Sequence, residues 1–111
     1  MSDAISRLHA AITRVSRNGD DHSRTARLLH SGRAKMAKKL VEEATEVTLD
    51  AVGNDRDAVV RESADLIYNL TVLWADMGIA PQDVWKEMDR REQLYGLAEK
   101  LHKGPVAVGS R

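Results

Sequence analysis

Two acidic clusters lie within stretches that otherwise read as helices facing a hydrophobic core. The first is Glu42-Glu43-Ala44-Thr45-Glu46, and the second is Glu62-Ser63-Ala64-Asp65. Each cluster holds two carboxylates three residues apart, and on an α-helix this spacing places both side chains on one face. Carboxylates brought together repel one another and are costly to remove from water, and a cation such as Mg²⁺, which prefers oxygen ligands and substrate phosphates, removes both penalties. The pattern therefore indicates a metal-dependent enzyme acting on phosphates.

Helices must position these clusters, and the hydrophobic periodicity predicts four main helices and one short helical segment. The expected segments cover about residues 3–17, 25–30, 33–52, 55–77, and 81 to between 91 and 100. Ser2 is expected to cap the first helix, Gly53 to end the second main helix, Asn54 or Asp55 to cap the third, and Pro81 to begin the last. No long stretch alternates with a period of two. We therefore expect an all-α, four- to five-helix bundle with short loops.

The acidic clusters are expected to meet between neighbouring helices. The loop Gly53-Asn54-Asp55 is short, so the two helices that carry the clusters should pack antiparallel. Each cluster borders the apolar stripe of its helix, and facing stripes would bring both carboxylate pairs into one crevice. Acidic helix faces are often only solvated, however, so the pattern alone also fits a helical module without catalysis.

The composition narrows the class of protein further. With 111 residues, 17 basic and 17 acidic side chains and a formal charge of zero, the chain has no bulk attraction to nucleic acid or to an anionic membrane. The N-terminus has no apolar run typical of a signal peptide, and the most apolar stretch is too short to span a bilayer. We expect a cytoplasmic protein with a single helical domain over residues 1–103 and a flexible tail over 104–111.

Four stretches, which span most of the chain from about Leu8 to Arg91, resemble one enzyme family. They are Thr25-Ala26-Arg27-Leu28-Leu29 and the runs from Lys35 to Val47, from Glu62 to Leu70 and from Gly78 to Met88. In these stretches the chain resembles the phosphoribosyl-ATP pyrophosphohydrolase family. The EExxE and ExxD motifs are also typical of the wider all-α nucleoside triphosphate pyrophosphohydrolases, which include the MazG-like enzymes. The resemblance implies the all-α fold of these pyrophosphohydrolases, assembled as a homodimer or higher oligomer.

The resemblance also implies a reaction and a set of site residues. The reaction is Mg²⁺-dependent hydrolysis of phosphoribosyl-ATP to phosphoribosyl-AMP and pyrophosphate, in histidine biosynthesis. Carried over by motif position, the metal ligands and catalytic carboxylates are Glu43, Glu46, Glu62 and Asp65. Lys39 shares a helix edge with Glu43 and is the first choice for a catalytic, phosphate-binding cation. The other expected substrate contacts are Arg33, Lys35 and Asn69, whereas Lys38 is expected to be solvated.

Four residues depart from the usual pattern of this family. The family usually has His at the position of Asn69, Gly at Val41, an aromatic residue at Arg24 and Lys at Ser31. These departures leave the metal motifs intact and fall on substrate-contact or packing positions. Two alternatives to phosphoribosyl-ATP hydrolysis therefore stay open. One is a MazG-like enzyme that acts on another nucleoside triphosphate. The other is a non-catalytic helical dimerisation module.

Overall fold

The protein is all-α, as predicted. A computed structural model describes residues 3–18 and 22–101, and in these residues it contains no strand. The helices are α1 (Ala4–Asn18), α2 (Arg24–His30), α3 (Arg33–Val52), α4 (Arg56–Asp76) and α5 (Pro81–Leu101). The predicted main helices are thereby confirmed to within a few residues at each end. The tail expected over 104–111 lies outside the described residues.

The contacts within the chain divide it into two compact units. The first unit, Met1–Pro81, contains α1 to α4, and the second, Gln82–Arg111, contains nearly all of α5. Every acidic and basic residue of the expected site belongs to the first unit. The single domain expected over residues 1–103 stays a prediction.

Side-chain caps begin three of the helices. Asp3, Ser23 and Asp55 each accept a hydrogen bond from the backbone N–H three residues later, at 2.7, 2.9 and 3.1 Å. Asp55 is thus confirmed as one of the two residues expected to cap α4. The cap expected for α1, Ser2, lies outside the described residues, and the side chain of Asp3 serves as the cap. These caps satisfy N–H groups that have no partner within the helix.

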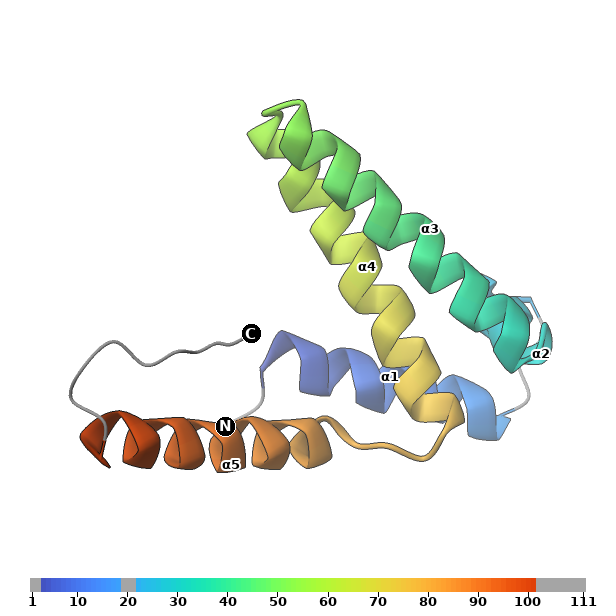
Figure 1. Cartoon of the computed structure of the whole chain (residues 1–111). Helices are drawn as coiled ribbons and strands as arrows, with labels where there is room; N and C mark the ends of the chain where they lie inside the picture. Colours follow the sequence, from blue (N-terminus) through green and yellow to red (C-terminus); the bar gives the residue numbers. More distant parts are fainter. Residues whose placement is uncertain (1–2, 19–21, 102–111) are drawn as a thin grey trace. The chain divides into compact units, whose positions relative to one another are not determined.

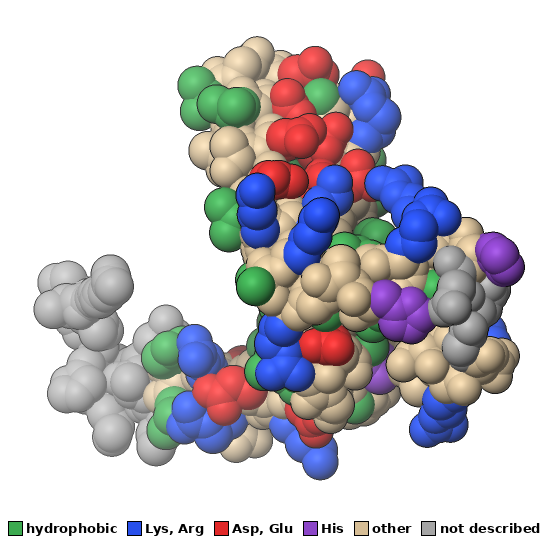
Figure 2. Space-filling model, turned by 90° about the vertical axis from the view of Figure 1, so that its right-hand side faces the viewer, with side chains coloured by type: hydrophobic (Ala, Val, Ile, Leu, Met, Phe, Trp, Pro, Cys, Tyr) green, Lys and Arg blue, Asp and Glu red, His purple; other side chains and the backbone are tan. Residues whose placement is uncertain are grey.

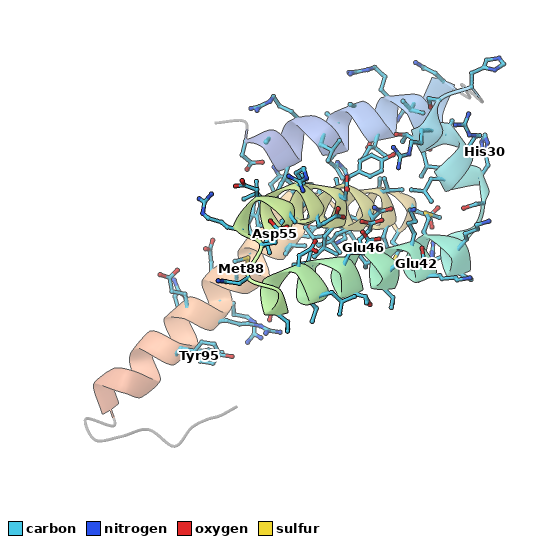
Figure 3. The ribbon with its side chains drawn as sticks, turned by 90° about the horizontal axis from the view of Figure 1, so that it is seen from above. His30, Glu42, Glu46, Asp55, Met88 and Tyr95 are labelled. Carbon is cyan, nitrogen blue, oxygen red and sulfur yellow. The ribbon has the colours of Figure 1, made fainter. Side chains whose placement is uncertain are left out.

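The turn between α3 and α4 reverses the chain within three residues (Figures 1 and 3). α3 ends at Gly53 as predicted, but Gly53 has a φ of −75°, and the left-handed conformation falls on Asn54, at a φ of 61°. Asn tolerates this conformation because its short polar side chain can hydrogen-bond locally. The Asp55 N–H donates to the Asp50 carbonyl at 3.0 Å and closes the turn. The two helices that carry the acidic clusters therefore run antiparallel, side by side.

The hydrophobic core lies where α1 and α2 pack against one half of the α3–α4 hairpin (Figure 1). Its buried centre is formed by Ile12 of α1, Met36 of α3 and Val72 of α4, each no more than 2% exposed. Leu28 and Leu29 of α2 pack against this centre. The core thus anchors both ends of the segment from α2 to α3, which carries most of the basic residues near the acidic clusters.

Candidate active site

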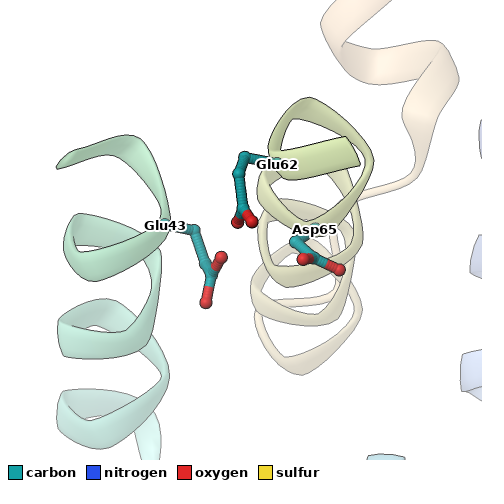
Figure 4. Close-up of side chains that lie close together, drawn as sticks. All are labelled: Glu43, Glu62 and Asp65. Atoms are coloured by element: carbon teal, nitrogen blue, oxygen red, sulfur yellow. The ribbon is translucent and has the colours of Figure 1, made fainter. Parts of the chain in front are cut away.

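Three carboxylates converge between α3 and α4. Glu43 of α3 faces Glu62 and Asp65 of α4 across the gap between the helices (Figure 4), and one oxygen atom from each lies within 4.8 Å of the others. Glu43 is 8% exposed, and a carboxylate this buried needs a charged or hydrogen-bonding partner. The predicted convergence of the two acidic clusters is therefore found in these three side chains.

Glu46, the fourth expected ligand, lies against Glu62. Burial raises the pKa of Glu62 above its ordinary value of 4.5, and the charges of Glu46, Asp65 and Glu43 raise it further. A side-chain hydrogen bond with Glu46 contributes in the same direction. All four carboxylates thus form one cluster, defined here as the acidic cluster, whose mutual repulsion a bound cation would relieve.

Lys39 lies at the edge of the acidic cluster. Its ammonium nitrogen is 3.7 Å from Glu43 Oε2, one helical turn along α3. The Lys39 side chain is 40% exposed and that of Glu43 only 10%, so the ammonium group borders solvent while the carboxylate does not. A single loose ion pair leaves most of the hydrogen-bonding capacity of Glu43 unused. Lys39 is therefore free to contact an anion that binds beside the cluster.

A basic pocket adjoins the acidic cluster, and Figure 2 shows Lys and Arg side chains gathered beside the acidic ones. The pocket encloses about 360 Å³. Two basic residues from α2 and three from α3 line it: Arg24, Arg27, Lys35, Lys38 and Lys39. Among the described residues, Glu42 is the one acidic residue in its lining. Positive charge at this density is costly unless an anion binds, and it suits a chain of phosphates.

A second pocket, of about 410 Å³, reaches the acidic cluster itself. Glu43 and Asp65 line it, together with Arg24 and Thr25 of α2. Its lining overlaps that of the basic pocket, so the two cavities are neighbours. An elongated ligand can therefore contact the carboxylates and the basic residues at once.

Asn69 is buried between these two pockets and lines both of them. Its Nδ2 group donates to the backbone carbonyl of Asp65 at 2.8 Å, so it does not orient the Asp65 carboxylate. Its Oδ1 atom has no hydrogen-bond partner among the described residues. A buried acceptor without a partner is uncommon in native proteins and indicates that a water or a ligand completes the site.

Arg33, also expected to contact the substrate, has another partner. Its Nε group donates to Asp76 Oδ2 at 2.9 Å and its Nη2 group to the Asp76 carbonyl at 3.4 Å, which ties the start of α3 to the end of α4. Arg33 lines neither pocket, whereas Lys38, expected to be solvated, lines the basic pocket. Our site therefore leaves out Arg33 and includes Lys38.

Because Arg33 pairs with Asp76 outside both pockets, we expect Arg33→Gln to have small effects on stability and activity. Because the Arg33 and Asp76 side chains are 57% and 26% exposed, we expect the free energy of unfolding to fall by no more than about 1 kcal/mol. KM and kcat should stay within about twofold of the wild type. Losing one charged hydrogen bond to the substrate would change them much more. Urea denaturation and steady-state kinetics measure both. A tenfold rise in KM would return Arg33 to the substrate-binding residues.

Sequence reasoning largely missed the contribution of α2. Arg24 and Arg27 of α2, and Tyr68 of α4, line the basic pocket. None of them was among the expected site residues, although Arg24 was one of the four departures expected at substrate-contact or packing positions. The signal was present in part, since Leu28 and Leu29 mark a buried face of α2 and so place its arginines at the protein surface. Which surface they meet depends on the path of the chain between α1 and α2.

Comparison with known proteins identifies a matching family and several related sequences. Residues 5–92 match the family model described as phosphoribosyl-ATP pyrophosphohydrolase. The chain is similar to the phosphoribosyl-ATP pyrophosphatase 2 of Bradyrhizobium diazoefficiens, with 60% identity over 97% of this chain and 81% of the relative. It is 57% identical to the phosphoribosyl-ATP pyrophosphatase 2 of Rhodopseudomonas palustris, over 96% of this chain and 81% of the relative. It is 45% identical to the phosphoribosyl-ATP pyrophosphatase of Azospirillum brasilense, over 86% of each chain.

Among the described helices, none has the length and apolar character needed to cross a lipid bilayer.

Proposed function

Because this chain belongs to the phosphoribosyl-ATP pyrophosphohydrolase family, we propose that it hydrolyses phosphoribosyl-ATP to phosphoribosyl-AMP and pyrophosphate, the histidine-biosynthesis reaction. The observation that carries the proposal is the acidic cluster beside the basic pocket. A hydrolase of this kind must hold a highly charged polyphosphate and stabilise the pyrophosphate that leaves it. The cluster and the pocket supply opposite charges at neighbouring positions for these two tasks. The nucleotide substrate makes the cytoplasm the proposed location.

We propose Glu43, Glu46, Glu62 and Asp65 as the residues that hold Mg²⁺. The donor set fits this ion because it consists of carboxylate oxygens, which Mg²⁺ prefers over nitrogen and sulfur ligands. The raised pKa of Glu62 supports the same assignment, since burial and the charges of the neighbouring carboxylates both oppose its ionisation and a cation would offset both. When bound, Mg²⁺ neutralises phosphate charge and polarises the bond to the phosphorus atom that is attacked.

The side chains of the basic pocket have a separate task. Hydrolysis forms a bond between a water oxygen and the α-phosphorus and breaks the bond between that phosphorus and the bridging oxygen. Negative charge then accumulates on the departing pyrophosphate. Lys39, at the edge of the acidic cluster, is placed to contact the phosphate next to the broken bond. Lys35, one turn earlier on α3, and Lys38, the residue before Lys39, line the pocket that would receive the rest of the leaving group.

Pyrophosphate release from phosphoribosyl-ATP tests this proposal, measured beside ATP and the other common nucleoside triphosphates, with Mg²⁺ and with a chelator. We expect the highest kcat/KM with phosphoribosyl-ATP and no release in the chelator. A higher kcat/KM with another triphosphate would instead identify a MazG-like enzyme. If no triphosphate is hydrolysed, the chain is a helical module without catalysis.

We also propose that a second copy of the chain covers part of the α3–α4 hairpin. Away from α1 and α2, the hairpin exposes five large apolar side chains by 39% to 83%: Val41, Leu49, Val52, Val60 and Ile67. Ala51 and Met77, two further apolar residues at the ends of these helices, are exposed as well. A small monomeric domain rarely leaves so much apolar surface in water, and covering one such side chain contributes about 1.5–3 kcal/mol. Homodimerisation would bury this apolar surface of the hairpin.

Leu49→Glu should therefore dissociate the assembly. We expect light scattering to give the mass of a dimer or larger oligomer for the wild type and of a monomer for this variant, because a buried carboxylate without a partner opposes association. Ser16→Glu, at an exposed position of α1, is the matched control and should keep the wild-type mass. A monomeric wild type would refute the proposed assembly.

A further inference from the structure

Only three of the described residues line both the basic pocket and the pocket at the acidic cluster. They are Arg24 of α2 and Tyr68 and Asn69 of α4. A ligand that extends from the carboxylates into the basic pocket must pass these three side chains. We call them the junction. Their chemistry therefore bears on what the site binds.

Arg24 is the basic residue of the junction. The other four cations line the basic pocket alone, whereas Arg24 also lines the pocket that contains Glu43 and Asp65. Arg24 makes no ion pair with another described residue, and its neighbour Arg27 already donates to the carbonyl of His22 at 2.9 Å. A guanidinium group presents several N–H donors in a planar fork that matches phosphate oxygens. Arg24 is thus suited to a phosphate located between the two pockets.

A hydrogen bond between two hydroxyl groups holds this part of α2 against α4. Thr25 Oγ1 and the Tyr68 hydroxyl oxygen are 2.7 Å apart and partly buried. Tyr68 also packs against the hydrophobic core, so its position is well defined. Ala26 is 2% exposed and Leu28 and Leu29 pack against the core, so this hydrogen bond adds a polar contact at the end of α2 that carries Arg24. The Thr25–Tyr68 bond therefore constrains where the side chain of the adjacent Arg24 can reach.

Asn69 provides an independent sign that a ligand binds at the junction. The residue is 4% exposed, and its Oδ1 atom has no hydrogen-bond partner among the described residues. A nucleotide carries both groups that the junction lacks: phosphate oxygens for Arg24, and hydroxyl or amino donors for Asn69.

From these observations we propose that Arg24 binds the phosphate chain of the substrate at the junction, and that the Thr25–Tyr68 hydrogen bond positions it there. The identity of the substrate rests on the proposed function. Arg24 touches the substrate in this proposal, whereas the hydroxyl groups of Thr25 and Tyr68 bond to each other and act through Arg24.

The first test compares Arg24→Gln with Arg17→Gln, which makes the same charge change at an exposed position of α1 outside both pockets. Calorimetry with inorganic pyrophosphate and Mg²⁺ measures binding without turnover, and phosphoribosyl-ATP hydrolysis gives KM. We expect Arg24→Gln to weaken pyrophosphate binding and raise KM by about 10- to 100-fold, the effect of losing one charged hydrogen bond. Arg24→Lys should recover part of the loss. Arg17→Gln should stay within about twofold of the wild type, since it removes no such bond.

The second test concerns position. Tyr68→Phe and Thr25→Val each remove one hydroxyl group with little change in shape. We expect each to raise KM about three- to tenfold, the size of one neutral hydrogen bond, with kcat changed less than twofold. In the Arg24→Gln background, Tyr68→Phe should raise KM no further, because its effect passes through Arg24. A general loss of folding would instead lower kcat and thermal stability.

Two outcomes would overturn the inference. One is equal pyrophosphate binding by the Arg24→Gln and Arg17→Gln variants. The other is a full additional effect of Tyr68→Phe without Arg24. Failure of the proposed function gives a different result: the wild type would not hydrolyse phosphoribosyl-ATP, yet Arg24→Gln would still weaken its binding of pyrophosphate.

Discussion

Glu43→Gln is expected to lower kcat for pyrophosphate release by at least about 10³-fold. The bound metal ion is expected to supply several kcal/mol of transition-state stabilisation, and each 1.36 kcal/mol is a factor of ten in rate. The amide has nearly the same shape as the carboxylate, so the packing around this buried position should survive. What the variant loses is the negative charge at the centre of the acidic cluster.

Asp57→Asn is the matched control for this variant. It makes the same change of charge in the first turn of α4, where the Asp57 side chain is 82% exposed and lies outside the acidic cluster. We expect its kcat to equal that of the wild type. Circular dichroism checks that both variants are folded. A Glu43→Gln variant that is folded and fully active would show that the acidic cluster does not hold the catalytic metal.

Glu62→Gln is expected to stabilise the metal-free protein at neutral pH, although it changes a residue of the proposed active site. The raised pKa of Glu62 means that the folded state binds more protons than the unfolded state above pH 4.5. In the metal-free wild type, the free energy of unfolding should therefore fall as the pH rises from 4.5 through the raised pKa. Glutamine does not titrate and adds no charge to the cluster, so this loss should disappear.

The same variant should lose the stabilisation that Mg²⁺ provides. At a concentration 100 times its Kd, a ligand adds about 2.7 kcal/mol, which corresponds to a rise of roughly 10 °C in the Tm of a domain this size. Thermal unfolding between pH 4.5 and 8, with Mg²⁺ and with a chelator, measures both effects. Glu87, whose pKa Arg90 and Arg91 hold at about 2 in the folded state, adds stability as its unfolded-state carboxyl group ionises near pH 4.5. This contribution is the same in the wild type and in the variant, so it cancels when the two are compared. An unchanged Mg²⁺ response in Glu62→Gln would remove Glu62 from the proposed ligands.

Much of the fold and part of the site follow from local sequence. The helix end at Gly53 and the cap at Asp55 could be predicted because the conformation at these positions depends on a few neighbouring residues. The sequence also predicted that the two acidic clusters face each other. Helical spacing places the carboxylates of each cluster on one face, and the short turn makes the two helices antiparallel. Family resemblance, and not spacing, supplied the nucleotide and the reaction.

Contacts between residues distant in sequence were decided by the tertiary structure alone. Arg33 has the same charge as its neighbours on α3, yet it pairs with Asp76, 43 residues away, and Thr25 meets Tyr68 over the same separation. Periodicity places each side chain on a face of its own helix, but it does not specify which other helix that face meets. That choice depends on how α1 and α2 pack against the hairpin. By itself, the sequence therefore determined the helices, the carboxylates and the neighbouring lysines of α3, whereas the packing of α2 determined that Arg24 and Arg27 join them.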